Sequence, residues 1–215
     1  MTAWRTDAFP IVLAGPSGAG KTTIARALLR RRSDLRFSVS ATTRPPRVGE
    51  VEGEDYLFVS RREFQRMKSA GEFLESAEVH GELYGTPAAQ LAAARQSGAH
   101  LLLDIDVQGA RSVKERESEA VSIFLLPPSG VRIVERLKER GSEDEQRLRD
   151  RLRTAQRELA TVREFDYVVI NDRLEETIDQ VEGILLAEHA STRRVGEVAS
   201  ARAEELADEI GRALG

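Results

Sequence analysis

The sequence contains no cysteine and only three histidines, His80, His100 and His189, which lie far apart along the chain. The absence of cysteine excludes disulfides, thiolate zinc sites and cysteine nucleophiles, and histidines this scattered give no sign of a metal cluster. Long apolar runs are missing as well, and the run within MTAWRTDAFPIVLAG is too short for a signal or membrane segment. We therefore expect a soluble cytoplasmic protein.

An excess of positive charge is also missing. The 32 basic and 36 acidic residues leave a net charge of -4, without the broad positive field that generic binding to nucleic acid or anionic membranes requires. Only four of the basic residues are lysines, and we attribute this arginine excess mainly to genomic bias. Any anion must therefore be captured locally.

The apolar residues that are present form short runs separated by helix-length amphipathic stretches. Such runs, typical of buried strands, occupy residues 9–14, 100–106, 121–126 and 165–171. A chain of 215 residues suits one domain, with or without inserted lobes. The alternation predicts an α/β fold in which helices flank a parallel sheet.

A different pattern occupies the segment between the first two of these runs. Shorter alternating runs at 56–60 and 72–86 predict a small, largely antiparallel lobe inserted into the core. Ser60-Arg61-Arg62-Glu63 is a capping box that predicts a helix start. Thr86-Pro87 predicts a second one, with Thr86 as the capping residue and Pro87 in the first helical position.

Two further segments have helical patterns. Residues 131–163 are mostly charged with apolar residues at helical spacing, and Gly141 divides them into a helical hairpin or a mobile lid. From about residue 190 onward, apolar residues recur every three or four positions. This stripe predicts a helix docked on its own domain or on a symmetry mate.

Residues 15–22, GPSGAGKT, fit the phosphate-binding pattern G-x-x-x-x-G-K-[ST]. In this pattern successive backbone N–H groups surround phosphate oxygens, the lysine reaches the outer phosphates and the threonine hydroxyl ligates Mg²⁺. The motif follows a predicted buried strand and opens a predicted helix, so it predicts a nucleotide site. We expect ATP to contact Gly15, Pro16, Ser17, Gly18, Ala19, Gly20, Lys21, Thr22 and Thr23.

A second anion site is suggested by Arg44 and Arg47, which flank two prolines. In an extended polyproline geometry the two arginines project to the same side about 9 Å apart, so with the Tyr56 hydroxyl they can hold one phosphate. The alternative is that both arginines pair with nearby acids, Glu50, Glu52, Glu54 or Asp55. The presence of the phosphate-binding loop favours the phosphate clamp.

Charged residues at two other places can serve phosphate chemistry. Asp104 and Asp106 end the apolar run LLLDID, where a carboxylate can hold Mg²⁺ through water or hydrogen-bond a substrate. Arg136 and Arg140 are four residues apart on one helical face, and Arg151 follows. Arginines on a mobile lid can neutralise a phosphoryl group in transfer, although many surface arginines only pair with neighbours.

Seven segments, in this order, resemble the guanylate kinase family over residues 9 to about 188: GPSGAGKTT, SVSATTRPPRVGEVEGEDYLFV, FLESAEVHGELYGT, LLLDIDVQGA, FLLPPS, RLKERG and DYVVIND. The resemblance implies an enzyme of purine nucleotide metabolism that transfers the γ-phosphoryl group of ATP to GMP with Mg²⁺. It also implies a kinase domain at 1–189, with a P-loop core at 8–41 and 98–189, a GMP-binding lobe at about 42–97 and a lid at about 138–160. The helical extension at 190–215 matches no block of the family.

The resemblance also implies roles for individual residues. The GMP phosphate would be held by Arg44, Arg47, Tyr56 and Tyr84. The guanine base would be read by Ser40, Glu75, Thr86 and Asp106. The metal would be near Thr22 and Asp104, and the catalytic group would comprise Lys21, Arg44, Arg136, Arg140 and Arg151.

Guanine recognition by these residues is chemically reasonable. Guanine offers N1–H and N2–H₂ as adjacent donors to the Glu75 carboxylate, while Thr86 can donate to O6. Adenine presents an acceptor at N1, and a site built for hydrogen bonds rejects analogues that leave its polar groups unpaired.

Two other functions fit parts of this pattern. A guanylate-kinase-like interaction module would bind peptides without catalysis, but such modules lose phosphate-handling residues, and Lys21 and Thr22 are present. A P-loop kinase acting on a phosphorylated sugar would have no reason to keep Glu75 and Thr86. The sequence does not decide whether dGMP is accepted or whether the protein is a monomer or a homo-oligomer.

Overall fold

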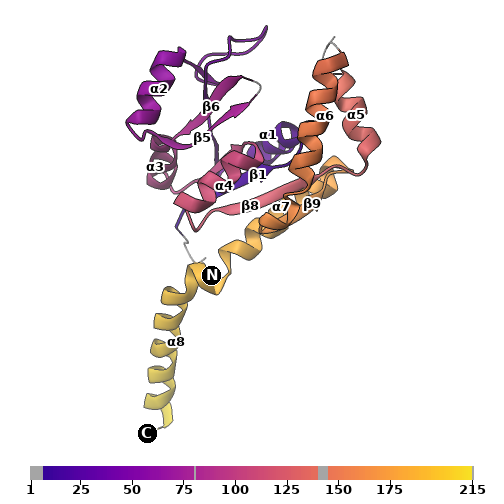
Figure 1. The fold of residues 1–215 in the computed structure, drawn as a ribbon. Helices are drawn as coiled ribbons and strands as arrows, with labels where there is room; N and C mark the ends of the chain where they lie inside the picture. Colours follow the sequence, from indigo (N-terminus) through magenta and orange to yellow (C-terminus); the bar gives the residue numbers. More distant parts are fainter. Residues whose placement is uncertain (1–6, 80, 140–144, 215) are drawn as a thin grey trace.

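A five-stranded parallel sheet forms the centre of the molecule (Figure 1). The computed structural model describes residues 7–79, 81–139 and 145–214. The sheet order is β2 (Leu35–Phe37), β7 (His100–Asp104), β1 (Pro10–Ala14), β8 (Val121–Leu126) and β9 (Tyr167–Ile170). All neighbouring strands pair in parallel, so the predicted parallel sheet is confirmed, with β2 as a strand that was not predicted.

Helices cover both faces of this sheet, as predicted. Helices α1 (Lys21–Arg31) and α7 (Leu174–His189) pack on one face, and α3 (Ala88–Gln96) and α4 (Val107–Arg116) pack on the other. Strand β1 is buried on both sides, because its alternate side chains enter different apolar clusters. This explains why its sequence is continuously apolar rather than alternating.

A second, four-stranded sheet lies beside the first. Its order is β4 (Leu57–Phe58), β3 (Ala41–Thr42), β6 (Glu82–Pro87) and β5 (Phe73–Val79). The β3–β4 pair is parallel and the other two pairs are antiparallel, so the sheet is mixed. Helix α2 (Arg61–Ser69) packs on it in an apolar cluster of its own.

One of the two predicted helix starts is correct. The Ser60 hydroxyl accepts a hydrogen bond from the Glu63 N–H at 3.1 Å, so the capping box that opens α2 is confirmed. The start predicted at Thr86-Pro87 is wrong in register, because Pro87 is the N-cap of α3 and Thr86 belongs to β6. The hydroxyl of Thr86 has another partner within the second sheet.

The charged segment folds into two helices, α5 (Gly130–Glu139) and α6 (Glu145–Leu159), called here the α5–α6 hairpin. Its own small core contains Ile133, Leu137 and Ala155. Gly141, where the sequence predicted the break, lies outside the described residues. A short 3-10 helix, η1 (Val162–Glu164), leads back to β9.

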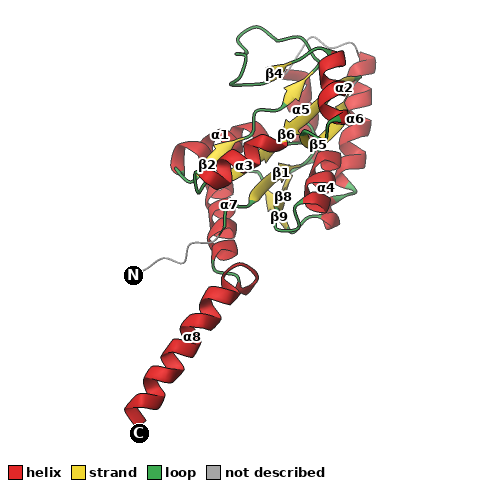
Figure 2. Cartoon of the chain, turned by 90° about the vertical axis from the view of Figure 1, so that its left-hand side faces the viewer, coloured by secondary structure: helices red, strands yellow, loops and turns green. Residues whose placement is uncertain are grey.

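The last helix, α8 (Thr192–Leu214), projects away from the rest of the molecule, as the two views in Figures 1 and 2 agree. Val195 is its only buried residue, and every residue after Ala199 is exposed. The prediction that this helix docks on its own domain is therefore wrong beyond its first turn. Among the described residues, no helix is both long and apolar enough to span a membrane.

Candidate functional site

The glycine loop joins β1 to α1 at the carboxyl edge of the central sheet. Gly20 has φ 90°, and a Cβ there would lie 2.5 Å from the Asn171 side-chain nitrogen, so the position excludes other residues. That nitrogen donates to the Ala19 carbonyl at 2.6 Å, and the Ala19 N–H donates to the Pro16 carbonyl at 2.9 Å. The Lys21 ammonium donates to the Gly15 carbonyl at 2.7 Å.

The α5–α6 hairpin contacts this loop through three side chains. Arg136 donates to the Gly18 carbonyl at 2.9 Å, and Arg151 donates to the Ser17 hydroxyl at 3.0 Å. The Ser17 N–H in turn donates to the Glu158 carboxylate at 3.3 Å. Two of the three predicted hairpin arginines therefore lie at the loop.

Arg140, the third arginine, lies outside the described residues. Glu158 was not predicted as a site residue, because nothing in its spacing distinguishes it from other acids of the charged segment. Burial raises the pKa of Glu158, while the nearby Lys21 charge and the Ser17 N–H act in the opposite direction. The Glu158 carboxylate thus lies next to the Ser17 N–H and Lys21, which are groups suited to binding phosphate.

Thr22 and Asp104 meet although 82 residues separate them. Strands β1 and β7 are neighbours in register, which brings the loop after β1 beside the end of β7. The Thr22 hydroxyl donates to the Asp104 carboxylate at 2.6 Å. A hydroxyl and a carboxylate are the hard oxygen donors that Mg²⁺ prefers, so the residues fit the metal that the resemblance implied.

A cavity of about 240 Å³ opens beside the same loop. Its lining includes Thr23 together with Asn171, Asp172 and Leu174. The last three were not predicted as site residues. A usable signal was their position at the end of the fourth apolar run and just after it, since ligands of parallel sheets bind at the carboxyl ends of strands.

On the second sheet, Arg44 lies over the ring of Tyr56, with its guanidinium carbon 5.1 Å from the ring centroid. The Tyr56 and Tyr84 rings are edge-to-face with centroids 6.1 Å apart, and interactions with Glu50 and Tyr84 raise the pKa of Arg44. Three of the four predicted phosphate-clamp side chains are thus adjacent. Burial raises the pKa of Tyr56, so its hydroxyl stays protonated and can donate.

The alternative of arginines pairing with nearby acids is also present in part. The Arg44 guanidinium makes two hydrogen bonds, at 2.8 and 2.9 Å, to the Glu50 carboxylate. The same carboxylate accepts the backbone N–H of Arg47 at 2.7 Å, while Arg47 itself is exposed. A carboxylate therefore occupies the arginine fork that the sequence analysis assigned to a phosphate.

The predicted base-reading residues form one hydrogen-bonded group. Glu75 and Thr86 face each other across β5 and β6, and Glu75 accepts both the Thr86 N–H at 3.0 Å and its hydroxyl at 2.8 Å. The Ser40 hydroxyl lies 3.4 Å from that of Thr86. Glu75 is 4% exposed, and burial raises its pKa to about 7.

Asp106 lies beside this group at the start of α4. Its carboxylate accepts the Gly109 N–H at 2.7 Å and so caps the helix. A Cβ at Gly109 would lie 2.9 Å from the Glu75 carboxylate, which means that the glycine leaves the space that Glu75 occupies. The negative charge of Asp106 adds to the rise in the Glu75 pKa.

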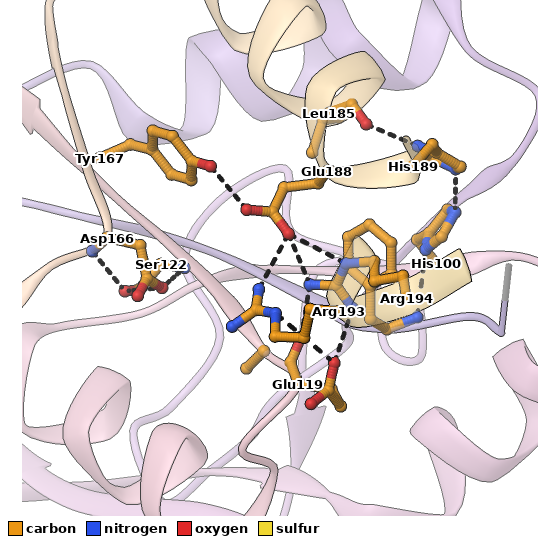
Figure 3. Close-up of polar contacts among 12 residues, drawn as sticks. His100, Glu119, Ser122, Asp166, Tyr167, Leu185, Glu188, His189, Arg193 and Arg194 are labelled. Carbon is orange, nitrogen blue, oxygen red and sulfur yellow. Dashed lines mark hydrogen bonds and ion pairs between the residues drawn. The ribbon is translucent and has the colours of Figure 1, made fainter. Parts of the chain in front are cut away.

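Two of the three histidines are not scattered in the fold. The ring nitrogens Nε2 of His100 and His189 are 2.9 Å apart (Figure 3), close to Asp34. His80 lies outside the described residues. Their separation along the sequence gave no sign of this contact, which exists because β7 and the end of α7 meet.

The hydrogen bonds of this pair use all four ring nitrogens. The Phe9 N–H donates to His100 Nδ1 at 3.1 Å, so His100 carries its proton on Nε2 and donates to His189. His189 then donates from Nδ1 to the Leu185 carbonyl at 2.6 Å. Burial lowers the pKa of His100 to about 4, so His100 is neutral, and its hydrogen bond to His189 joins β7 to α7 rather than holding a metal.

The central parallel sheet, its covering helices and the glycine loop after β1 define an α/β protein with a P-loop. Comparison with known proteins then identifies the family. The guanylate kinase family model matches residues 7–188, and the chain belongs to the guanylate kinase family.

Individual relatives agree with this assignment. The chain is 45% identical over 187 residues to a guanylate kinase of Clostridium perfringens (strain SM101 / Type A), covering 87% of each protein. It is 47% identical over 184 residues to a guanylate kinase of Desulfitobacterium hafniense (strain Y51), covering 86% of this chain and 92% of that protein. The crystal structure of guanylate kinase from Anaplasma phagocytophilum superimposes with a TM-score of 0.74 at 39% identity, covering 90% of this chain and 92% of that one.

Proposed function

We propose that this protein is an ATP:GMP phosphotransferase, which converts ATP and GMP to ADP and GDP with Mg²⁺. The observation that carries the proposal is the buried Glu75 carboxylate, hydrogen-bonded to Thr86, which lies on β6 two residues after Tyr84 of the phosphate clamp. The activity belongs to purine nucleotide metabolism, and the cytoplasm is the location that we propose for it.

Guanine specificity would come from the Glu75 group. One carboxylate oxygen already accepts both Thr86 donors, and the other faces the space beside Gly109. An ionised carboxylate can accept the N1–H and N2–H₂ donors of guanine, and the Thr86 hydroxyl can turn toward O6. Adenine would leave a buried carboxylate opposite an acceptor, which costs most of the binding energy.

The GMP phosphate would bind at Arg44, Arg47, Tyr56 and Tyr84. Glu50, which now accepts from both Arg44 and the Arg47 backbone, would have to give up the guanidinium fork. The exchange is favourable because a phosphate carries more charge than a carboxylate and has more acceptor oxygens for bidentate arginine. Glu50 thus keeps Arg44 oriented before the substrate arrives.

ATP would bind with its phosphates in the glycine loop and its nucleoside toward the neighbouring cavity. Lys21 neutralises the outer phosphates, and Arg136 and Arg151 are already at the loop. Thr22 and Asp104 would hold Mg²⁺, which supplies charge neutralisation at the phosphates when bound. The acceptor phosphate is anionic near neutral pH, so positioning and charge neutralisation carry the catalysis without a general base.

The parts of the fold then have separate tasks. We propose that the second sheet with α2 is the GMP-binding lobe, that the α5–α6 hairpin is the lid, and that α8 is an extension outside the kinase domain. Catalysis is favoured over a peptide-binding module because Lys21, Thr22 and Arg136 all lie at one loop. A sugar-phosphate kinase would not need a buried carboxylate on the acceptor side.

The test is ADP release from ATP and Mg²⁺ with GMP, dGMP, AMP, CMP or UMP as acceptor. We expect turnover that is selective for GMP, with an increase in KM for GMP of about 10²-fold or more in Glu75→Gln. The matched control is Glu78→Gln, an exposed glutamate on the same strand, which should behave as the wild type. Folded protein that binds ATP without phosphorylating GMP would refute the proposal.

A further inference from the structure

Helix α8 lies beyond the part of the chain that the guanylate kinase family model matches, and it has no described neighbour along most of its length. From Glu197 to Leu214 its residues are exposed except for partly exposed Ala199. A lone helix of about five turns is marginal in water, and Gly211 weakens it by about 1 kcal/mol. The helix therefore needs a partner to be stable.

The direction of α8 is fixed where it leaves the domain (Figure 3). The side chains of Arg194 and Glu188 are 4% and 7% exposed and form an ion pair at 2.9 Å. Arg194 also lies over the Phe9 ring, 3.8 Å from its centroid, and the Tyr167 hydroxyl donates to Glu188 at 2.6 Å. This α7–α8 junction fixes the direction in which the first turn of α8 leaves the domain.

The exposed length of α8 has one apolar face. Ala199, Ala203, Leu206 and Ile210 follow one another at intervals of three or four residues, so they share one side of the helix. Leu206 and Ile210 are 42% and 60% exposed. Two small residues toward the start of the face and two large ones toward its end make it unlike an ordinary solvated helix.

We infer that this face binds the same face of a second copy of the chain, with the two helices antiparallel. In that arrangement Leu206 lies opposite the partner's Ala203, and Ile210 lies opposite the partner's Ala199. Each large side chain meets a small one, which allows close packing along the whole contact. A parallel arrangement would instead place alanine against alanine and leucine against leucine, leaving uneven layers.

The charges beside the apolar face favour the same arrangement. Arg202 and Glu209 are seven residues apart and lie on one flank of the helix. Antiparallel pairing brings each Arg202 beside the partner's Glu209, twice by symmetry. Within its own helix Arg202 contacts Glu205 at 2.8 Å and Glu209 at 3.6 Å, and these exposed pairs contribute little and do not compete strongly.

Other occupants fit less well. Residues 197–214 contain five acidic and two basic residues, a net charge of -3, which disfavours nucleic acid and anionic membrane surfaces. Because α8 is joined to the domain only at its first turn, antiparallel pairing places the two domains at opposite ends and leaves both active sites open. A contact of about five turns should give a micromolar association rather than an obligate dimer.

The first test is sedimentation equilibrium of the full chain over about 1–300 µM. We expect a concentration-dependent dimer that Ile210→Glu abolishes. The matched control, Ala201→Glu, adds the same charge on the opposite side of the helix and should dimerise as the wild type does. Both variants should retain kinase activity, because neither residue lies near the site. A wild type that stays monomeric throughout this range overturns the inference.

A charge exchange tests the orientation. Arg202→Glu should weaken the dimer about fivefold or more, because it places like charges together at two symmetric positions. Adding Glu209→Arg to the same chain should restore it. Since the natural chain has no cysteine, Ala199→Cys and Ile210→Cys chains can also be mixed and oxidised. Cross-links between unlike chains support antiparallel pairing, and cross-links only between like chains overturn it.

Discussion

At the residue scale, Glu75 is a carboxylic acid whose burial disfavours its ionised form, and this ionised form is the one proposed to recognise guanine. Burial raises its pKa to about 7, whereas guanine requires the ionised carboxylate as an acceptor. Below that pH the free enzyme is mostly protonated at Glu75, so kcat/KM for GMP should fall about tenfold per pH unit. Rate measurements from pH 5.5 to 8.5 check this, and the step should vanish in Glu75→Gln.

A profile with no change near pH 7 in the wild type would argue against this role of Glu75. The profile for ATP at saturating GMP provides the internal comparison. GMP binding should also release protons at pH 6.5, because the base stabilises the carboxylate. Titration calorimetry in two buffers of different ionisation enthalpy measures that release.

Glu158 is the second acid in an unusual position. Its carboxylate accepts the Ser17 N–H, a donor that the loop would otherwise offer to a phosphate. We therefore expect Glu158→Gln to bind ATP about three- to tenfold more tightly, by removing a negative charge from an anion site. Equilibrium binding of ATP measures this, with the exposed Glu145→Gln on the same helix as control.

The pH dependence of ATP affinity distinguishes charge repulsion between Glu158 and ATP from a role of Glu158 in positioning the loop. Burial raises the pKa of Glu158, so acidification should reduce the difference in ATP affinity between wild type and Glu158→Gln. Weaker ATP binding in the variant at every pH would mean that Glu158 positions the loop instead.

At the scale of elements, strands were predicted correctly where the apolar run in the sequence is long. The apolar runs at 9–14, 100–106, 121–126 and 165–171 contain β1, β7, β8 and β9. Strands β2 and β3 are only three and two residues long, too short for any periodicity to show. The error at Thr86 has a chemical cause, because a threonine before a proline is also a good donor to a buried carboxylate across a strand pair.

Site residues that belong to a local sequence motif could be predicted. Site residues that only the fold brings together could not. The glycine loop was found because its pattern is local. Glu158 at Ser17, and His100 at His189, are contacts between residues 141 and 89 positions apart, which no spacing rule reveals. The pairing of Arg44 with Glu50 was weighed as an alternative, and the structure contains it.

The α7–α8 junction provides a prediction at this scale. Arg194→Met removes the main partner of the buried Glu188 carboxylate, leaving Arg193 and Tyr167 to compensate. We expect a loss of about 2–4 kcal/mol in the free energy of unfolding. Urea denaturation measures it, and Arg202→Met, which breaks an exposed pair, should change stability by less than about 0.5 kcal/mol.

Glu188→Gln combined with Arg194→Met should recover part of that loss, because no uncompensated charge stays buried. If the double variant is as unstable as the sum of the single ones, the junction acts through packing on Phe9 rather than through the ion pair.

At the scale of the whole molecule, the end of β7 connects the two halves of the site. Asp104 faces the glycine loop through Thr22, and two residues later Asp106 lies beside Glu75 at the start of α4. A single strand end therefore sets the distance between the proposed ATP and GMP sites. We propose that the α5–α6 hairpin and the loop near Arg44 move around this fixed centre.

The dependence of stability on pH also belongs to the whole molecule, because two distant groups act in opposite directions. The His100 pKa is about 4 in the folded chain, below its ordinary value of about 6.5, so stability is lost as pH falls through this range. The Glu75 pKa is about 7, above its ordinary value near 4.5, so its contribution is present at low pH and is lost as pH rises toward 7.

Between about pH 4.5 and 6.5 these two slopes should nearly cancel, and the wild type should have a flat profile. Glu75→Gln should then lose up to about 2–3 kcal/mol on acidification from pH 7 to 5, while His100→Asn should gain a similar amount relative to its own value at pH 7. Asp34 and His189 lie close to His100 in the folded chain, and His100→Asn changes the hydrogen bond to His189. Urea denaturation at pH 5, 6 and 7 measures all three proteins, and parallel profiles would show that neither group is coupled to folding, because coupling requires a pKa that differs between the folded and unfolded chain.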